Sequence, residues 1–168
     1  MITLVLGGAR SGKSRVAEAL AAQSPVPVSY VATTRVEPAD PDLVERIAAH
    51  RARRPESWGT VEVTPAQLST VLRTTAGTVL VDSLGAWVAG APDFAVDGAG
   101  LCDALRSRAG NSVVVSDEVG MSVHPSSELG RRFRDVLGQL NQAVAATADE
   151  VLLVVAGRVL PLAPMPLA

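Results

Sequence analysis

The chain has 168 residues, of which 48% are hydrophobic and 19% charged, and its formal net charge is −2. This composition indicates one globular domain, residues 1–168, and excludes a disordered chain, while the small negative charge argues against a nucleic-acid partner. A single cysteine, Cys102, excludes an internal disulfide and suits the cytoplasm, and no apolar stretch is long enough for membrane insertion or a signal peptide.

The chain begins with a phosphate-binding motif. The apolar run Ile2–Leu6 predicts a buried strand, Arg15–Ala22 predicts a helix, and the sequence between them satisfies G-x-x-x-x-G-K-[ST]. In this motif glycine-rich backbone N–H groups surround phosphate oxygens, the lysine reaches the β- and γ-phosphates, and the final hydroxyl ligates Mg²⁺. The predicted nucleotide-binding residues are Gly7, Gly8, Ala9, Arg10, Ser11, Gly12, Lys13 and Ser14.

Lys13 is the only lysine, because the other fourteen of the fifteen basic residues are arginine. A compact ammonium on a flexible stem is therefore kept at the one position where a planar guanidinium does not replace it. The alternative is a glycine-rich turn that contains a lysine by chance. The flanking strand and helix favour the nucleotide site, with Lys13 as a catalytic residue and Ser14 as a metal ligand.

Further apolar runs, rich in valine and leucine and without clean alternation, predict parallel strands covered on both faces. They are Val28–Ala32, Thr78–Val81, Ser112–Val115 and Val151–Ala156, with a shorter strand at Thr60–Val63. Helices are predicted at Pro41–Arg54, Pro65–Leu72, Leu101–Arg108 and Leu129–Ala146. The alternation predicts an α/β fold with a doubly wound, mostly parallel sheet flanked by helices, and ligands at the carboxyl ends of its strands.

The last predicted helix has an apolar stripe along one side. This stripe is predicted to face the core and contains Leu129, Phe133, Leu137, Leu140 and Val144. Gly90–Phe94 and Asp97–Gly100 are predicted to be loops, and the proline-rich tail from Pro161 to Ala168 is predicted to be extended or frayed.

Carboxylates follow two of the predicted strands. Asp82 ends an apolar strand, as the usual metal-holding partner of a phosphate loop does, although an N-cap or a turn would also explain it. Asp117 and Glu118 follow the strand that begins at Ser112, where they could serve substrate, metal or a simple turn. We therefore predict that Asp82, with Ser14, ligates Mg²⁺.

His50 lies among Arg46, Arg51, Arg53 and Arg54 near the end of a predicted helix. Surrounding cations disfavour the imidazolium and leave a neutral, nucleophilic ring, and arginines suit phosphate oxygens. The composition of the segment alone favours the alternative, a solvated basic helix end.

Together these segments resemble the bifunctional adenosylcobinamide kinase/adenosylcobinamide-phosphate guanylyltransferase family of cobalamin biosynthesis, over nearly the whole chain. The H-x-x-x-R-P-x-x-W segment that begins at His50 and is followed by Glu62, and the D-E-V-G block at Asp117–Gly120, are the most specific parts of the match. The other matching blocks are Gly7–Ser14, Tyr30–Thr34, Phe133–Gln142, Ala148–Val151 and Val154–Gly157.

The resemblance implies a P-loop NTPase fold and two reactions at one nucleotide site. The γ-phosphate of ATP or GTP passes to the aminopropanol hydroxyl of adenosylcobinamide; then a histidine, matching His50, carries GMP from GTP as a phosphoramidate to adenosylcobinamide phosphate. Glu62 is our candidate for reading the N–H donors of guanine. The residues that the match assigns to the nucleotide, beyond the phosphate loop, are Thr33, Thr34, Arg51, Ala52, Arg53, Arg54, Glu62 and Asp82.

The same resemblance implies a homo-oligomer, a trimer. Four departures accompany it: Ala49 replaces a second histidine of some relatives, Asp117 stands where asparagine is common, Gly90–Gly110 is short, and the tail Leu160–Ala168 is unusually rich in proline. The alternatives are a P-loop kinase of another small alcohol, without guanylyl transfer, and a non-enzymatic nucleotide-switched binding module.

Overall fold

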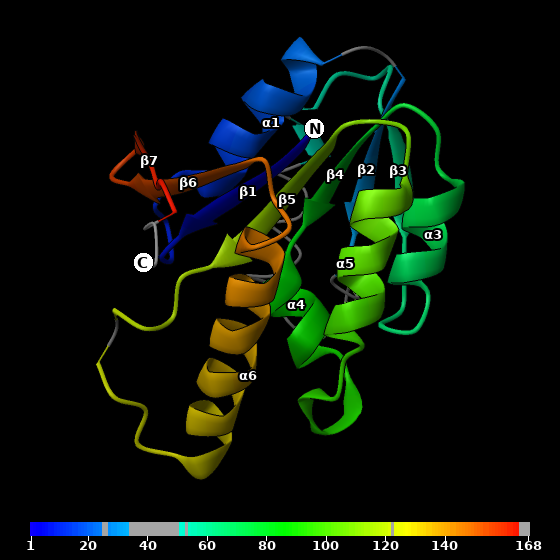
Figure 1. The fold of residues 1–168 in the computed structure, drawn as a ribbon. Helices are drawn as coiled ribbons and strands as arrows, with labels where there is room; N and C mark the ends of the chain where they lie inside the picture. The colour runs from blue at the N-terminus through cyan, green and yellow to red at the C-terminus, as the bar shows by residue number, and fades with distance from the viewer. Residues whose placement is uncertain (25–26, 34–50, 53, 122, 165–168) are drawn as a thin grey trace.

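A seven-stranded sheet forms the centre of the molecule in a computed structural model that describes residues 1–24, 27–33, 51–52, 54–121 and 123–164 (Figure 1). The strand order is β3-β2-β4-β5-β1-β6-β7, and every neighbouring pair is parallel except β6 and β7. The strands are β1 (Ile2–Gly7), β2 (Val28–Ala32), β3 (Gly59–Glu62), β4 (Thr78–Asp82), β5 (Ser112–Asp117), β6 (Glu150–Val155) and β7 (Arg158–Pro161).

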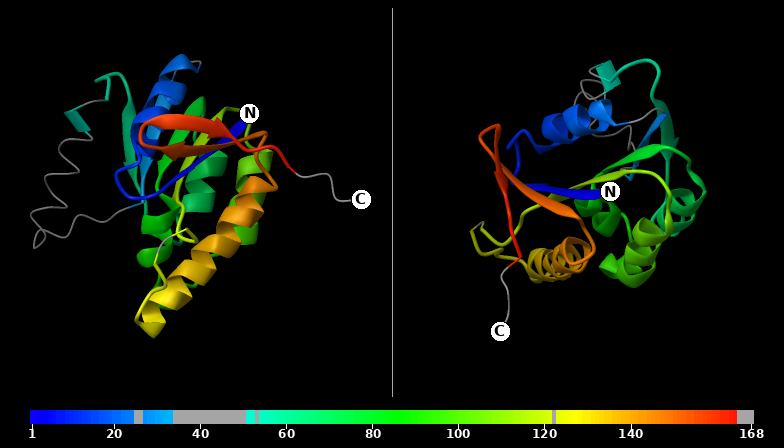
Figure 2. Two further views of the ribbon diagram at one scale, coloured as in Figure 1. Left: turned by 90° about the vertical axis from the view of Figure 1, so that its left-hand side faces the viewer. Right: turned by 45° about the horizontal axis from the view of Figure 1, so that its top comes forward.

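Helices cover both faces of the sheet (Figures 1 and 2). Helix α1 (Lys13–Gln23) packs on one face against β1, β4 and β5. The other face carries α3 (Leu68–Thr74), α4 (Leu84–Ala89), α5 (Gly98–Ser107) and α6 (Glu128–Ala145), with a 3₁₀ turn η1 (Pro92–Phe94) after α4. In the described part of the chain, no helix combines the length and the hydrophobicity that a membrane span requires.

Two hydrophobic clusters, one on each face, explain why the strands read as continuous apolar runs. Alternate residues of β5 show the division, because Val113 and Val115 pack with α1 whereas Val114 packs with the four-helix face. The same alternation places Leu80 on the α1 face of β4, and therefore Asp82, two residues further, on that face too. The doubly wound, mostly parallel fold predicted from the sequence is confirmed.

The predicted strands agree with the observed ones to within two residues, whereas the helix boundaries need correction. Helix α3 begins at Leu68 rather than at Pro65, because Thr64–Gln67 forms a turn. The Gln67 N–H donates to the Thr64 carbonyl, and the Gln67 side-chain oxygen accepts from the Thr64 N–H. Helix α4 was not predicted, and Gly98–Gly100 is the first turn of α5 rather than a loop, with the Asp97 side chain as N-cap.

The apolar stripe predicted for α6 is wrong at its first residue, Leu129. Leu137, Leu140 and Val144 are buried, but Leu129 is 66% exposed because α6 begins at Glu128 and its first turn extends beyond the core. Of the predicted helix Pro41–Arg54, residues 34–50 and 53 lie outside the described part of the chain; Arg51 and Ala52 are helical, and Arg54 lies in a bend.

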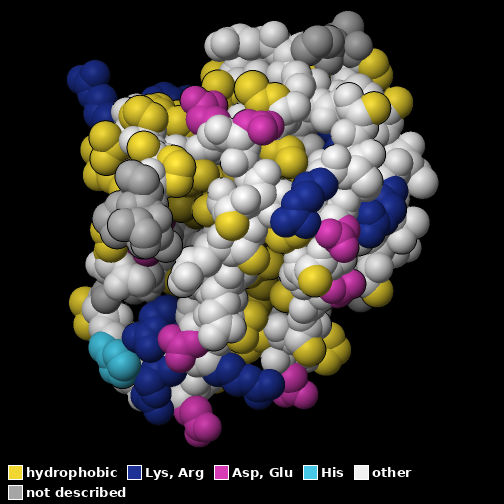
Figure 3. Space-filling view, in the orientation of Figure 1, with side chains coloured by type: hydrophobic (Ala, Val, Ile, Leu, Met, Phe, Trp, Pro, Cys, Tyr) yellow, Lys and Arg dark blue, Asp and Glu magenta, His cyan; other side chains and the backbone are white. Residues whose placement is uncertain are grey.

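The antiparallel strand β7 was not predicted either. It forms a hairpin with β6 through Ala156 and Gly157, whose φ angles of 50° and 74° are those of a two-residue turn with both residues left-handed. Val159 and Leu160 of β7 are largely exposed, and hydrophobic side chains gather on the surface over β6 and β7 (Figure 3). The sheet therefore ends in an apolar edge strand.

Candidate functional site

The phosphate-binding motif occupies the turn between β1 and α1, at the carboxyl ends of the parallel strands. Gly12 has φ 95°, a left-handed conformation that glycine adopts without strain. A Cβ at Gly7 would lie 2.4 Å from the Ser11 hydroxyl and 2.8 Å from the Val154 carbonyl oxygen. Both glycines are thus required by the loop's own backbone path, as the motif predicts.

Neighbouring segments hold this loop from two sides. The Gly157 N–H, in the β6–β7 turn, donates to the Ser11 carbonyl at 2.8 Å, and the Glu118 N–H, after β5, donates to the Gly7 carbonyl at 3.1 Å. The β6–β7 hairpin, although at the edge of the sheet, therefore forms a wall of the phosphate loop.

Lys13 forms an ion pair across this loop. Its ammonium lies 2.8 Å from Asp117 Oδ1 and donates to the Gly8 carbonyl at 3.2 Å. The Lys13 side chain is 12% exposed and that of Asp117 36% exposed. Asp117 reaches Lys13 because β5 lies beside β1, with Asp117 in register with Gly7. The sequence left Asp117 without an assigned role, and the structure makes it the carboxylate partner of the motif lysine.

The end of β5 is held in place by α6 and α4. Asn141 of α6 donates to the Asp117 carbonyl at 3.0 Å and its side-chain oxygen accepts from Ser116 at 2.6 Å. Gly85 leaves room for the carboxylate, because a Cβ there would meet Asp117 Oδ2 at 2.2 Å. Glu118 has the simpler of the predicted roles: its carboxylate accepts the N–H groups of Gly120 and Met121 and closes a turn.

Asp82 lies at the end of β4, on the face that carries α1. The Tyr30 hydroxyl donates to Asp82 Oδ2 at 3.0 Å. Burial, followed by the nearby Asp82 carboxylate, raises the pKa of Tyr30 well above its ordinary value, so Tyr30 stays a protonated donor. Tyr30 is 6% exposed. Its role was missed from the sequence, although Tyr30 is the chain's single tyrosine and begins one of the blocks that match the family.

Two described arginines of the basic segment, Arg51 and Arg54, contact residues of β3 and β2. Arg51 Nη2 lies 2.9 Å from Glu62 Oε1 at the end of β3, and both side chains are more than half exposed. The guanidinium carbon of Arg54 lies 3.5 Å from the centroid of the Tyr30 ring. The structure therefore brings Arg51, Arg54, Glu62 and Asp82 to the carboxyl ends of β2, β3 and β4.

The structure describes only some of the other residues that were predicted to contact the nucleotide. Thr33 is buried, and its hydroxyl donates to the Ser83 carbonyl at 2.7 Å, which ties the end of β2 to the start of α4. Ala52 is exposed beside Arg51. Thr34, His50 and Arg53 lie outside the described residues.

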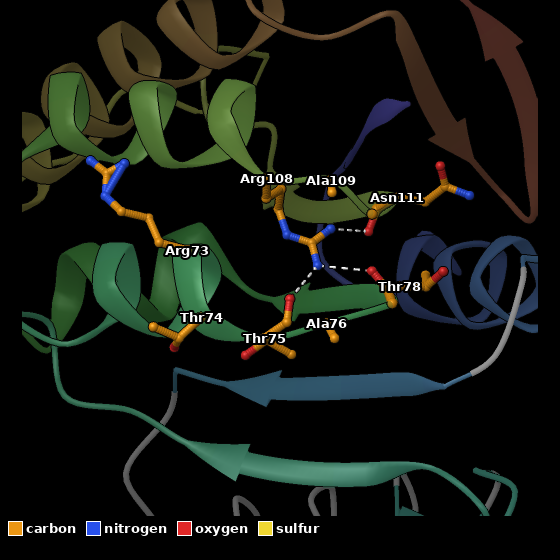
Figure 4. Close-up of a pocket in the computed structure, with 10 residues that line it drawn as sticks. Arg73, Thr74, Thr75, Ala76, Thr78, Arg108, Ala109 and Asn111 are labelled. Atoms are coloured by element: carbon orange, nitrogen blue, oxygen red, sulfur yellow. Dashed lines mark hydrogen bonds between the residues drawn. The ribbon is translucent and has the colours of Figure 1, made fainter.

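A hollow of about 500 Å³ lies at the opposite, amino ends of β4 and β5, lined by Arg73, Arg108 and the segments 74–78 and 109–111 (Figure 4). The Arg108 guanidinium donates to the carbonyls of Leu72, Thr75 and Gly77, as well as to Asn111 and Ser112. Burial lowers the pKa of Arg108. This guanidinium joins the loops before β4 and β5, so the hollow is a structural feature rather than part of the nucleotide site.

Comparison with known proteins agrees with this geometry. The family model described as cobinamide kinase / cobinamide phosphate guanyltransferase matches residues 3–162. The bifunctional adenosylcobalamin biosynthesis protein CobP of Pseudomonas aeruginosa is 43% identical over 99% of this chain and 100% of its own length. CobU of Escherichia coli K12, which bears the same bifunctional description, is 39% identical over 94% of this chain and 97% of its own length.

Solved structures support the fold alone. An ATPase of the type III secretion system of pathogenic bacteria superposes with a TM-score of 0.53 at 11% identity, over 90% of this chain and 50% of that one. The chain thus has the P-loop NTPase fold that the strand order and the phosphate loop indicate.

Proposed function

The chain belongs to the cobinamide kinase / cobinamide phosphate guanyltransferase family, and we propose that it carries out both of these reactions at one nucleotide site. The observation that carries the proposal is the contact of Arg54 with Tyr30, which in turn bonds Asp82. This contact brings Arg54, one described residue of the segment predicted to transfer GMP, to the sheet face that carries α1, the helix that begins in the phosphate loop. It supports a site in which both sets of residues act on one triphosphate.

In the kinase reaction, the aminopropanol hydroxyl of adenosylcobinamide attacks the γ-phosphorus of ATP or GTP. The bond from that phosphorus to the β-phosphate oxygen breaks, the nucleoside diphosphate leaves, and the proton of the hydroxyl is released to solvent. Lys13 stabilises the charge on the transferring group, while the loop N–H groups hold the phosphates. Because Asp117 is the carboxylate partner of Lys13, the phosphates must displace Asp117 or share the Lys13 ammonium with it.

In the guanylyltransferase reaction, a neutral imidazole nitrogen of His50 attacks the α-phosphorus of GTP and pyrophosphate leaves. An oxygen of adenosylcobinamide phosphate then attacks the same phosphorus, the P–N bond breaks, and adenosylcobinamide-GDP forms. Arg51, Arg53 and Arg54 would neutralise the phosphate oxygens during both transfers. Glu62 is proposed to accept the N–H donors of guanine. It would do so either while it keeps its ion pair with Arg51 or after guanine replaces Arg51 as its partner.

The donor set suits Mg²⁺, which the nucleotide would bring with its phosphates. A carboxylate, Asp82, and a hydroxyl, Ser14, are hard oxygen ligands, and Mg²⁺ is usually held by one or two carboxylates together with substrate phosphates. Within the described residues no three histidine, cysteine or acidic side chains gather as they would in an all-protein metal site. Bound there, Mg²⁺ would neutralise charge on the phosphates.

We propose that the enzyme acts in the cytoplasm as a homo-oligomer, a trimer by the resemblance described above. The exposed apolar surface of β6 and β7 supports an assembly, because exposed patches of this kind mark protein interfaces. Light scattering of the wild type and of Leu160→Glu tests this interface. The negative charge at position 160 should weaken an apolar contact between subunits and lower the average molecular mass. A mass equal to that of the wild type would exclude this surface as the interface.

The two activities are tested by following the γ- and the α-phosphate of GTP into the products of the two reactions. With γ-labelled GTP the label should appear on adenosylcobinamide, and with α-labelled GTP it should appear in adenosylcobinamide-GDP. Transfer of the γ label alone would leave a kinase without guanylyl transfer, and nucleotide binding without either transfer would leave a binding module.

A further inference from the structure

Tyr30 contacts two parts of the proposed site that are far apart in the sequence. It lies on β2 opposite Leu80 of β4, so that Asp82 is its diagonal neighbour on the α1 face. The Tyr30 side chain spans this distance, because its hydroxyl makes a 3.0 Å hydrogen bond to Asp82 Oδ2. A carboxylate held through one oxygen has a defined direction for the other.

The ring of the same side chain holds Arg54. With the guanidinium carbon 3.5 Å from the ring centroid, the cation lies over the ring, where the quadrupole attracts it. Tyr30 is itself fixed, because it is 6% exposed and packs among the apolar residues on the α1 face. It can therefore orient both neighbours at once, one by its hydroxyl and one by its ring.

We propose that Tyr30 is a positioning residue for both reactions, orienting Asp82 through its hydroxyl and Arg54 through its ring. This inference rests on the proposed function, because it takes Asp82 as the carboxylate for Mg²⁺ and Arg54 as a phosphate ligand. It adds that the two roles are separable: the hydroxyl affects metal binding, and the ring affects GMP transfer.

The hydroxyl is tested with Tyr30→Phe, which keeps the ring and removes the donor to Asp82. Mn²⁺ binding in the presence of a β,γ-imido analogue of GTP is measured by electron paramagnetic resonance. We expect Mn²⁺ to bind about tenfold more weakly, as when an outer partner of a metal ligand is removed. Val31→Ala is the control, because Val31 is buried on the opposite face of the same strand; equal Mn²⁺ affinity in Tyr30→Phe and wild type would overturn this half.

The ring is tested with Tyr30→Met, which keeps most of the volume but holds no cation. The rate of covalent labelling by α-labelled GTP should fall about fivefold relative to Tyr30→Phe. If Tyr30→Met does not fold, Tyr30→Leu is measured instead, with the same loss expected relative to Tyr30→Phe. A labelling rate equal to that of Tyr30→Phe in the variant that is measured would overturn the role of the ring.

The two proposals fail in different ways. A wild type that takes up no α label would overturn the proposed guanylyl transfer, whatever the Tyr30 variants do. A wild type that is labelled and binds Mn²⁺, together with Tyr30 variants that match it in both measurements, would overturn only the role of Tyr30.

Discussion

The Lys13 ammonium and the Asp117 carboxylate form an ion pair of 2.8 Å across the phosphate loop. The pair follows from the strand order, which places the end of β5 beside the end of β1. A carboxylate of the protein thus compensates the cation of the loop, and the phosphates of a nucleotide compete with this carboxylate for Lys13.

Asp117→Asn should therefore strengthen nucleotide binding when Mg²⁺ is absent. The amide no longer repels phosphates or neutralises Lys13, and we expect the dissociation constant for GTP to fall about fivefold, roughly 1 kcal/mol for a partly exposed charge. Isothermal titration calorimetry in EDTA measures this. Weaker binding in Asp117→Asn would mean that Asp117 positions Lys13 for the phosphates instead of competing with them.

Lys13→Arg should lose both transfers despite keeping the positive charge. The planar guanidinium is larger and directs its donors differently from the Lys13 ammonium, which is on a 12% exposed side chain and bonds both the Gly8 carbonyl and Asp117. We expect kcat/KM to fall at least about 100-fold for each reaction. Retention of either activity within a few-fold of wild type would refute the assigned role of Lys13.

Tyr30 should resist ionisation in the folded protein. Its pKa is raised by burial and by Asp82, whereas in the unfolded chain it has the ordinary value of about 10. The folded state therefore keeps the proton where the unfolded state loses it, and this contribution to stability, complete below about pH 10, declines as the pH rises further.

Because Tyr30 is the only tyrosine, tyrosinate absorbance reports on it alone. In native protein the absorbance should stay low through pH 10.5, and in urea it should rise with a midpoint near 10. Tyr30→Phe should abolish the signal. A native midpoint near 10 would contradict the buried hydrogen bond to Asp82.

Arg108→Ala should destabilise the fold without weakening nucleotide binding. The carbonyls of Thr75 and Gly77 lose their donor at the amino ends of the strands, and we expect a loss of about 2–4 kcal/mol in the free energy of unfolding. Urea denaturation measures it. Arg106→Ala is the control, because its ion pair with Asp103 is exposed, and it should cost less than about 1 kcal/mol. Equal losses in both variants would refute the role of Arg108.

The sequence predicted the centre of the sheet well because β1, β4 and β5 are buried on both faces and read as apolar runs. Helix α4 was missed because its residues, Leu84–Ala89, include a glycine and follow the strand after a single N-cap, Ser83. Strand β7 was missed because all four of its residues are exposed, so its sequence shows no alternation of buried apolar and exposed polar residues. Leu129 was assigned to the core because periodicity does not show how far a helix extends beyond it.

The phosphate loop could be predicted because its motif is local, whereas the contacts of its residues could not. Lys13 meets Asp117, and Tyr30 meets Asp82, through strands that are far apart in the sequence. Those pairs depend on the order and register of the strands, which cannot be deduced directly from a single sequence. The assignments of Thr34, His50 and Arg53 lie outside the described residues and remain predictions.

The measurement that tests the central claim most directly is covalent labelling by GTP, and the chain offers a matched control because it has only two histidines. Wild type, His50→Ala and His124→Ala are incubated with Mg²⁺ and GTP labelled at either the α- or the γ-phosphate. We predict that wild type and His124→Ala take up the α label alone, in an acid-labile and base-stable bond, and that His50→Ala takes up none. Nucleotide binding without α label in wild type, or full labelling of His50→Ala, would contradict guanylyl transfer through His50.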